Sequence, residues 1–169
     1  ALLLVSISLG WAKPVTQSPY LGVTNVMTTL NKYAKDSLKN LSVNSCTDIT
    51  GFSLIGHGYE MASGSNKTIE FYSNSIPLLN DSLEYASMGI IPEGMYNNLE
   101  YLKDIFRCDS SVTQEMQDVL LDPQTSGGLL LSMPEKDALE FISRMELNNP
   151  WTRIIGTVTD KQSHSIIIK

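Results

Sequence analysis

The chain is organised around one stretch, Asn44-Ser45-Cys46-Thr47-Asp48-Ile49-Thr50-Gly51-Phe52-Ser53-Leu54-Ile55-Gly56-His57. It begins as a strand-like segment and then passes through a turn over residues 47–51, where two hydroxyl side chains, a carboxylate and a glycine occur together. Apolar residues then recur at helical spacing, at positions 52, 55, 59 and 62. The sequence therefore predicts a strand, a polar turn and the start of a helix.

This turn carries groups that suit a phosphate and metal site. Backbone N–H groups at the start of a helix attract anions, and a carboxylate such as Asp48 is a hard oxygen ligand for the Mg²⁺ that accompanies phosphate. The same residue types also form helix N-caps and tight turns. Taken by themselves, the residue types favour that structural interpretation.

Two longer strings add information that single residues do not. Residues 46–57 resemble a signature of the selenophosphate synthetase (selenide, water dikinase) family. A second string, Asp122-Pro123-Gln124-Thr125-Ser126-Gly127-Gly128-Leu129-Leu130, resembles another signature of that family, and the two follow each other in the family's order. The similarity runs from about Thr24 to the end of the chain.

The remaining pattern predicts strands separated by helices, which indicates an α+β or mixed α/β sandwich. Strands are expected at 2–7, 68–72, 129–132, 151–159 and 165–168, the last two as a hairpin. Helices are expected over 23–41, from Pro77 to a C-cap at Gly89, over 112–121, and after a Ser132–Glu135 capping box. That last helix is expected to bury positions 138, 139, 142 and 145, and residues 90–111 are expected to be irregular.

The resemblance implies the C-terminal domain fold of the aminoimidazole ribonucleotide synthetase-like family, a mixed sheet with packed helices. Residues 1–169 are expected to form this one domain, and the chain, which lacks an initial Met, is expected to be a fragment without the family's N-terminal ATP-binding domain. In that family ATP, selenide and water become selenophosphate, AMP and phosphate. The resemblance also implies a homodimer.

The same resemblance assigns roles to residues of the turn. It implies that Asp48 is a ligand of Mg²⁺ on ATP, whereas Thr47, Thr50 and Gly51 are expected to contact phosphate at the start of the helix. The family's nucleophilic cysteine or selenocysteine and its essential lysine lie in the N-terminal domain. No catalytic residue is therefore assigned to this chain, which is expected not to turn over ATP alone.

A non-catalytic remnant, scaffold or dimerisation domain is the alternative hypothesis. It is motivated by two departures from the family. The stretch Ser6-Ile7-Ser8-Leu9-Gly10-Trp11-Ala12 lacks the family's lysine and proline, and Ser53 stands where the family has glycine. If the backbone at residue 53 requires a positive φ, serine is unfavourable there.

Other polar residues receive structural interpretations. His57 has no recognised orienting partner, and Asn97 and Asn98, which match a family loop, indicate only amide hydrogen bonding. The 125–128 segment fits a tight turn slightly better than an anion-binding nest. Cys46 is expected to be a buried thiol rather than a nucleophile, because no basic neighbour lowers its pKa.

Composition limits the function classes. Apolar residues make up 42% of the chain and charged residues 18%, as in ordinary globular proteins. A net charge of −6 argues against nucleic acid or an anionic membrane as the main partner. The two cysteines form no CxxC pair, which fits a cytoplasmic setting. The apolar residues 1–12 are too few to span a bilayer.

Overall fold

The computed structural model describes residues 2–7, 24, 26–146, 148–149 and 151–169, with backbone alone for 2–7. The predicted loop over 15–22 and residues 8–12 of the altered stretch lie outside these ranges, as does Val23 at the start of a predicted helix. Within the described part of the chain, no helix combines the length and apolar character needed to cross a membrane.

A seven-stranded mixed sheet forms the centre of the fold, in the order β2-β5-β1-β6-β3-β7-β4. Strand β7 runs parallel to β3 and β4, and the other neighbouring strands are antiparallel. The strands are β1 (Leu2–Ile7), β2 (Ser45–Asp48), β3 (Lys67–Phe71), β4 (Phe106–Cys108), β5 (Leu129–Pro134), β6 (Arg153–Asp160) and β7 (Ile166–Ile168).

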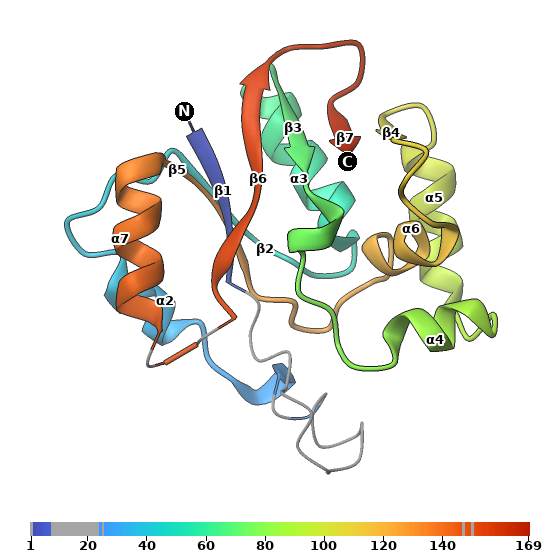
Figure 1. Cartoon of the computed structure of the whole chain (residues 1–169), viewed down its shortest axis with the longest axis horizontal. Helices are drawn as coiled ribbons and strands as arrows, with labels where there is room; N and C mark the ends of the chain where they lie inside the picture. Colours follow the sequence, from blue (N-terminus) through green and yellow to red (C-terminus); the bar gives the residue numbers. More distant parts are fainter. Residues whose placement is uncertain (1, 8–23, 25, 147, 150) are drawn as a thin grey trace.

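Helices cover both faces of this sheet. They are α2 (Lys32–Ser37), α3 (Ser53–Gly64), α4 (Ser82–Ser87), α5 (Glu93–Leu102), α6 (Gln114–Leu120) and α7 (Glu135–Met145), with a 3₁₀ turn at Ser73–Ser75. Figure 1 shows α2 and α7 together at the left of the molecule, with α3, α5 and α6 grouped at the right. The predicted fold class, a mixed α/β sandwich with a mixed sheet, is confirmed.

Strand β5 lies between two hydrophobic cores. Leu130 packs in the core that α3, α5 and α6 share, whereas Leu131 and Met133 pack in the core beneath α2 and α7. Because successive side chains of a strand point to opposite faces, this alternation buries both faces of β5. The near-continuous apolar character of residues 129–133 follows from that burial.

The predicted terminal hairpin is wrong, because β3 lies between β6 and β7. The side chain of Thr68 holds the connecting segment over the end of β3. Its hydroxyl donates to the carbonyl oxygen of His164 at 2.8 Å and accepts from the backbone N–H of Gln162 at 2.9 Å. The buried residues Ile69 and Phe71 thereby gain a neighbouring strand on each side.

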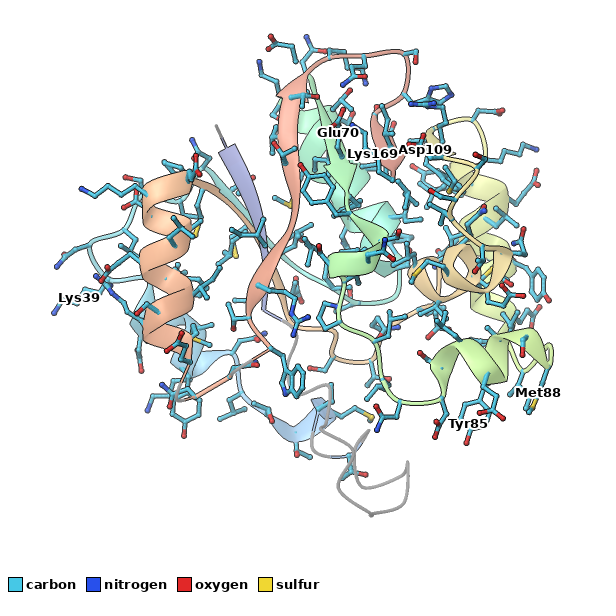
Figure 2. All side chains as sticks on the ribbon, viewed as in Figure 1. Lys39, Glu70, Tyr85, Met88, Asp109 and Lys169 are labelled. Atoms are coloured by element: carbon cyan, nitrogen blue, oxygen red, sulfur yellow. The ribbon has the colours of Figure 1, made fainter. Side chains whose placement is uncertain are left out.

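A charged pair also joins β3 to the residue after β7. The ammonium group of Lys169 donates to Glu70 Oε2 at 2.7 Å, and both side chains are labelled in Figure 2. This hydrogen bond is the main reason why the pKa of Glu70 is lowered. Side chains near both ends of β3, Thr68 and Glu70, therefore hold the chain that crosses over β3 and the residue that follows β7.

The continuous helix predicted over 23–41 is also wrong. Helical structure at residues 26–28 ends at Thr29, and α2 begins at Lys32. The hydroxyl of Thr28 donates back to the carbonyl oxygen of Thr24, a bond that often bends helices. The expected apolar face is accordingly split: Ala34 is buried, whereas Leu30 and Tyr33 are 67% and 53% exposed.

The segment expected to be irregular contains a ten-residue helix, α5. Its buried positions Met95, Asn98 and Leu102 follow helical spacing, but the polar Asn98 hid this pattern in the sequence. The preceding helix α4 starts at Ser82 rather than Pro77, and Gly89 has the positive φ of +75° expected of a C-cap. Met88 of α4, labelled in Figure 2, is 60% exposed.

The predicted capping box before α7 is wrong as well. Ser132 is a buried residue of β5, and Pro134 precedes the helix without a side-chain capping bond. The buried face of α7 consists of Ala138, Phe141 and Met145, whereas Leu139 is exposed. Strand pairing with β1 and β2 thus overrides the local capping signal.

Candidate functional site

The two signature strings meet in one place, although they are far apart in the sequence. The N–H of Ile49 donates to the carbonyl oxygen of Gly128 at 2.9 Å, and the N–H of Gly127 donates to that of Ile49 at 2.9 Å. The N–H of Gln124 donates to the carbonyl oxygen of Thr50 at 3.1 Å. The turn that ends β2 therefore rests on the loop that leads into β5.

The glycines of the second string permit this close approach. A Cβ at Gly127 would lie 2.9 Å from the carbonyl oxygen of Ile49, and Gly128 has a φ of +88°. Any larger residue would push the two segments apart or strain the backbone. Since the N–H of Gly127 is already donated to Ile49, the contacts favour the tight turn over the anion-binding nest.

The side chain of Asn98, in α5, also hydrogen-bonds to this turn. Its side-chain amide donates to the carbonyl oxygens of Gly51 and Leu121, each at 3.0 Å. The residue is buried, whereas its neighbour Asn97 is exposed. One amide thus joins the first turn to the segment immediately before the second string, a role that the sequence did not reveal.

Asp48 lies at the end of β2, an edge strand of the sheet, and its side chain is exposed. Thr47 is half-buried, with its hydroxyl 3.4 Å from the carbonyl oxygen of Asp48. Gly51 is exposed, and a Cβ built on it would meet no described atom within 4 Å. Thr47 and Asp48 are thus neighbouring residues of β2, whose side chains point to opposite faces of the strand, and only Gly51 of these three lies in the turn itself.

Thr50, the fourth predicted residue, is engaged by a histidine. Its Oγ1 lies 3.0 Å from His57 Nε2, and the other ring nitrogen, Nδ1, lies 2.9 Å from Glu60 Oε2. The interpretation that His57 lacks an orienting carboxylate is wrong. Residues three apart on a helix are neighbours, so the spacing of His57 and Glu60 contained this signal.

Ser53 begins α3 with a φ of +67°, a conformation that L-residues rarely adopt. The residue is fully buried, and its hydroxyl lies 3.5 Å from the N–H of Gly56. The unfavourable positive φ anticipated from the missing glycine is therefore present. We estimate its cost at about 1 kcal/mol, because the left-handed region crowds the Cβ.

Cys46 differs from its prediction in exposure but not in reactivity. It is exposed rather than buried. Partial desolvation raises the pKa of its thiol, and the negative charge of Asp48 raises that pKa further. Since the thiolate is the nucleophilic form, this environment does not activate Cys46. Cys46 and Asp48 are two residues apart on β2 and therefore share one side of the strand.

Asp122, the first residue of the second string, is a feature that the sequence interpretation missed. Its Oδ2 accepts from the side-chain amide of Gln124 at 3.0 Å, and its Oδ1 is buried without a partner among the described residues. Desolvation raises the pKa of this half-buried carboxyl. It lines a cavity of about 180 Å³ together with Tyr85, Ile91 and Asp118.

The turn fits the chemistry of magnesium in one respect. Among the described residues, no group of three or more His, Cys, Asp or Glu side chains comes together as a metal site. Mg²⁺ commonly takes one or two carboxylates and completes its shell with phosphate oxygens and water. The exposed carboxylate of Asp48, beside hydroxyl groups and the start of α3, is compatible with such partial coordination.

Comparison with known families and proteins gives a consistent result. The model for "AIR synthase related protein, C-terminal domain" matches residues 23–169. A selenide, water dikinase of Clostridium botulinum (strain Eklund 17B / Type B) is 60% identical over 94% of this chain and 46% of its own length. That of strain Alaska E43 / Type E3 is 63% identical over 87% and 43%. The chain thus spans less than half the length of these relatives.

Solved structures share the fold at low sequence identity. The hydrogenase maturation protein HypE superimposes with a TM-score of 0.57 at 13% identity, over 99% of this chain and 49% of that protein. Thiamine-monophosphate kinase from Stenotrophomonas maltophilia K279a gives a TM-score of 0.57 at 16% identity, with the same coverage. These similarities agree with the predicted sheet and its helices.

Replacing Asn98 with Ala is expected to destabilise the chain by about 2 kcal/mol, because the carbonyl groups of Gly51 and Leu121 lose their shared donor. Thermal unfolding followed by circular dichroism measures this effect. Asn97→Ala is the matched control, and its change is expected to stay within about 0.5 kcal/mol, since that side chain is exposed. Equal losses in the two variants would show that the bridge contributes nothing.

Asp122→Asn is expected to change the pH dependence of stability. Because burial raises the pKa of Asp122 in the folded state, folding favours its protonated form. This contribution is fully present below the unfolded pKa, near 4, and is lost as pH rises through the folded pKa.

The variant cannot ionise, so its unfolding midpoint should rise relative to that of wild type as the pH increases above about 4. Denaturant titrations at several pH values measure the difference, with Asp118→Asn as the control from the same cavity wall. A difference for Asp122→Asn that stays constant with pH would contradict the expected desolvation of Asp122.

Proposed function

Because this chain belongs to the family of AIR synthase related protein C-terminal domains, we propose that it is the C-terminal part of a selenide, water dikinase. This enzyme would be the ATP-dependent phosphotransferase that converts ATP, selenide and water into selenophosphate, AMP and phosphate. The observation that carries the proposal is the junction of the two signature strings. Three backbone hydrogen bonds hold them together and leave the Asp48 carboxylate exposed beside the start of α3.

In this proposal Asp48 contributes one carboxylate to Mg²⁺ bound on the phosphates of ATP. The metal ion, when bound, would offset negative charge on the phosphate oxygens. Asp48 supplies its oxygen from the end of a strand whose backbone is paired with β5, so the carboxylate starts from a fixed position. A ligand of Mg²⁺ on ATP must also be reachable from solvent, and the exposure of Asp48 supports this role.

Thr47, Thr50 and Gly51 are the proposed phosphate contacts. Gly51 leaves the backbone of the turn accessible, because no described atom lies within 4 Å of a Cβ placed there. Thr47 would supply its hydroxyl group from β2, and Thr50 from the turn that follows. The first turn of α3 adds the partial positive charge of a helix N-terminus.

We assign no nucleophile to the residues of this chain. The raised pKa of Cys46 supports this assignment, because its environment favours the thiol over the thiolate. In the proposed mechanism the domain binds and positions Mg²⁺ and ATP phosphate, while chemistry on selenide uses groups from the rest of the enzyme. The chain by itself is accordingly proposed to be inactive.

A homodimer in the cytoplasm completes the proposal. Three large apolar side chains near α2 support a protein contact: Met27, Leu30 and Tyr33 are 45%, 67% and 53% exposed. Apolar surface of this kind is characteristic of protein interfaces. The same feature would serve a non-catalytic dimerisation domain, which remains the second candidate function.

Asp48→Asn, introduced into a full-length selenide, water dikinase that contains this domain, is expected to lower selenide-dependent AMP formation about tenfold or more. The amide lacks the negative charge that would bind the metal ion, so the decrease in AMP formation should be largest at low Mg²⁺ concentration. Asp36→Asn, an exposed position in α2, is the control and should retain the rate. Unchanged AMP formation in Asp48→Asn would remove Asp48 from the mechanism.

A further inference from the structure

The imidazole ring of His57 is held at both nitrogens. Nδ1 lies 2.9 Å from Glu60 Oε2, and Nε2 lies 3.0 Å from Thr50 Oγ1. The histidine is 8% exposed, and the ring of Phe52 packs edge-on against it at a centroid distance of 5.7 Å. A linear chain of three polar groups therefore runs from the surface of α3, through a buried ring, to the proposed phosphate contact.

The chemistry of these groups restricts where the protons lie. An ionised carboxylate accepts hydrogen bonds but cannot donate them, so Glu60 places a proton on Nδ1 of His57. In a neutral imidazole Nε2 then has a free lone pair, and the hydroxyl of Thr50 must donate to it. Thr50 can accept a further hydrogen bond in that state, but it has no proton left to donate.

Protonation of His57 reverses the direction of this hydrogen bond. Both ring nitrogens then donate, and Nε2–H donates to the oxygen of Thr50. The hydroxyl group of Thr50 keeps its proton but no longer donates it to His57, so it can donate a hydrogen bond to another acceptor. A fully ionised phosphate group offers acceptor oxygens without protons, so the Thr50 hydroxyl can bind it only when His57 is protonated.

We propose that His57, held by Glu60, is a positioning residue that sets the donor character of Thr50, and that phosphate binding at this turn is coupled to proton uptake by His57. The inference deepens the proposed function and rests on it for the identity of the anion. His57 acts through Thr50 and does not itself contact the phosphate.

Few charged groups around His57 could link its protonation to anion binding in another way. Residues 44–64 contain no Lys or Arg, and Asp48 is the carboxylate of β2. Among the described residues, no charged group other than Glu60 forms a hydrogen bond or ion pair with the imidazole. In particular, the imidazole ring has no hydrogen bond or ion pair with any charged side chain of β3, α5 or α6. These side chains are Lys67, Glu70, Glu93, Glu100, Glu115 and Asp118.

An NMR titration of the two histidines in the 169-residue chain tests the proposal. Inorganic phosphate is the first probe, and sulfate is a second anion that does not titrate in this pH range. At ten times its dissociation constant, sulfate, which has no proton to donate to Thr50, should shift the protonation equilibrium of His57 about tenfold toward the charged form. Inorganic phosphate retains a proton in this pH range and should shift the equilibrium in the same direction. His164 is an internal control, because it is exposed and bonded to Ser163 rather than to the turn.

Two variants make the test specific. Thr50→Val removes the hydroxyl at similar size and should abolish the anion effect on His57, whereas Thr50→Ser keeps the hydroxyl and should preserve the effect. An unchanged His57 equilibrium in the presence of both anions would overturn the proposal. An equal shift of both histidines, or an equal shift in Thr50→Val, would overturn it too.

This titration is separate from the test of the proposed enzyme. It needs neither turnover nor Asp48, so loss of the anion effect leaves the Asp48 assay unaffected. Conversely, unchanged AMP formation in Asp48→Asn would reject the metal role and leave the histidine readout intact. The two failures are therefore distinguishable.

Discussion

Three backbone hydrogen bonds between the turn after β2 and the loop before β5 determine where every candidate residue lies. They join Ile49 to Gly127 and Gly128, and Thr50 to Gln124. Buried backbone groups must find partners, and here each segment supplies the partners of the other. Asp48 consequently ends a paired strand, and α3 begins at a fixed point beside it. A substitution that separated the two segments would displace the carboxylate and the helix start together.

The junction contains a residue with an unfavourable backbone conformation and a buried polar atom without a partner among the described residues. Ser53 enters α3 with a positive φ, and Asp122 keeps a buried carboxylate oxygen without a partner among the described residues. Such features cost free energy and persist where the surrounding structure fixes them. Asn98, which donates to both sides of the junction, is one such constraint. His57 is another, because it fixes the Thr50 hydroxyl from inside the helix.

Much of the fold follows from local pattern, and the errors have identifiable causes. The strand at residues 2–7 and the helix before the second string were predictable, because the periodicity of their apolar residues agrees with the turn-forming residues that flank them. The hairpin failed because side-chain bonds of Thr68 guide the chain past β3, and α5 was missed because a buried asparagine looks polar in sequence. At the site, the three-residue spacing of His57 and Glu60 was sufficient to predict their contact. The contact between the two signature strings depends on tertiary hydrogen bonds, which local sequence patterns do not predict.

Amide hydrogen exchange measured by NMR on the 169-residue chain tests most directly whether the two segments form one unit. If they do, the amides of Ile49, Gln124 and Gly127 should be strongly protected and should become exchangeable through one common opening, with similar free energies. Exchange of these three amides at the rates of an unstructured peptide would show that the junction does not hold. In that case the placement of Asp48 beside the start of α3 would lose its physical basis.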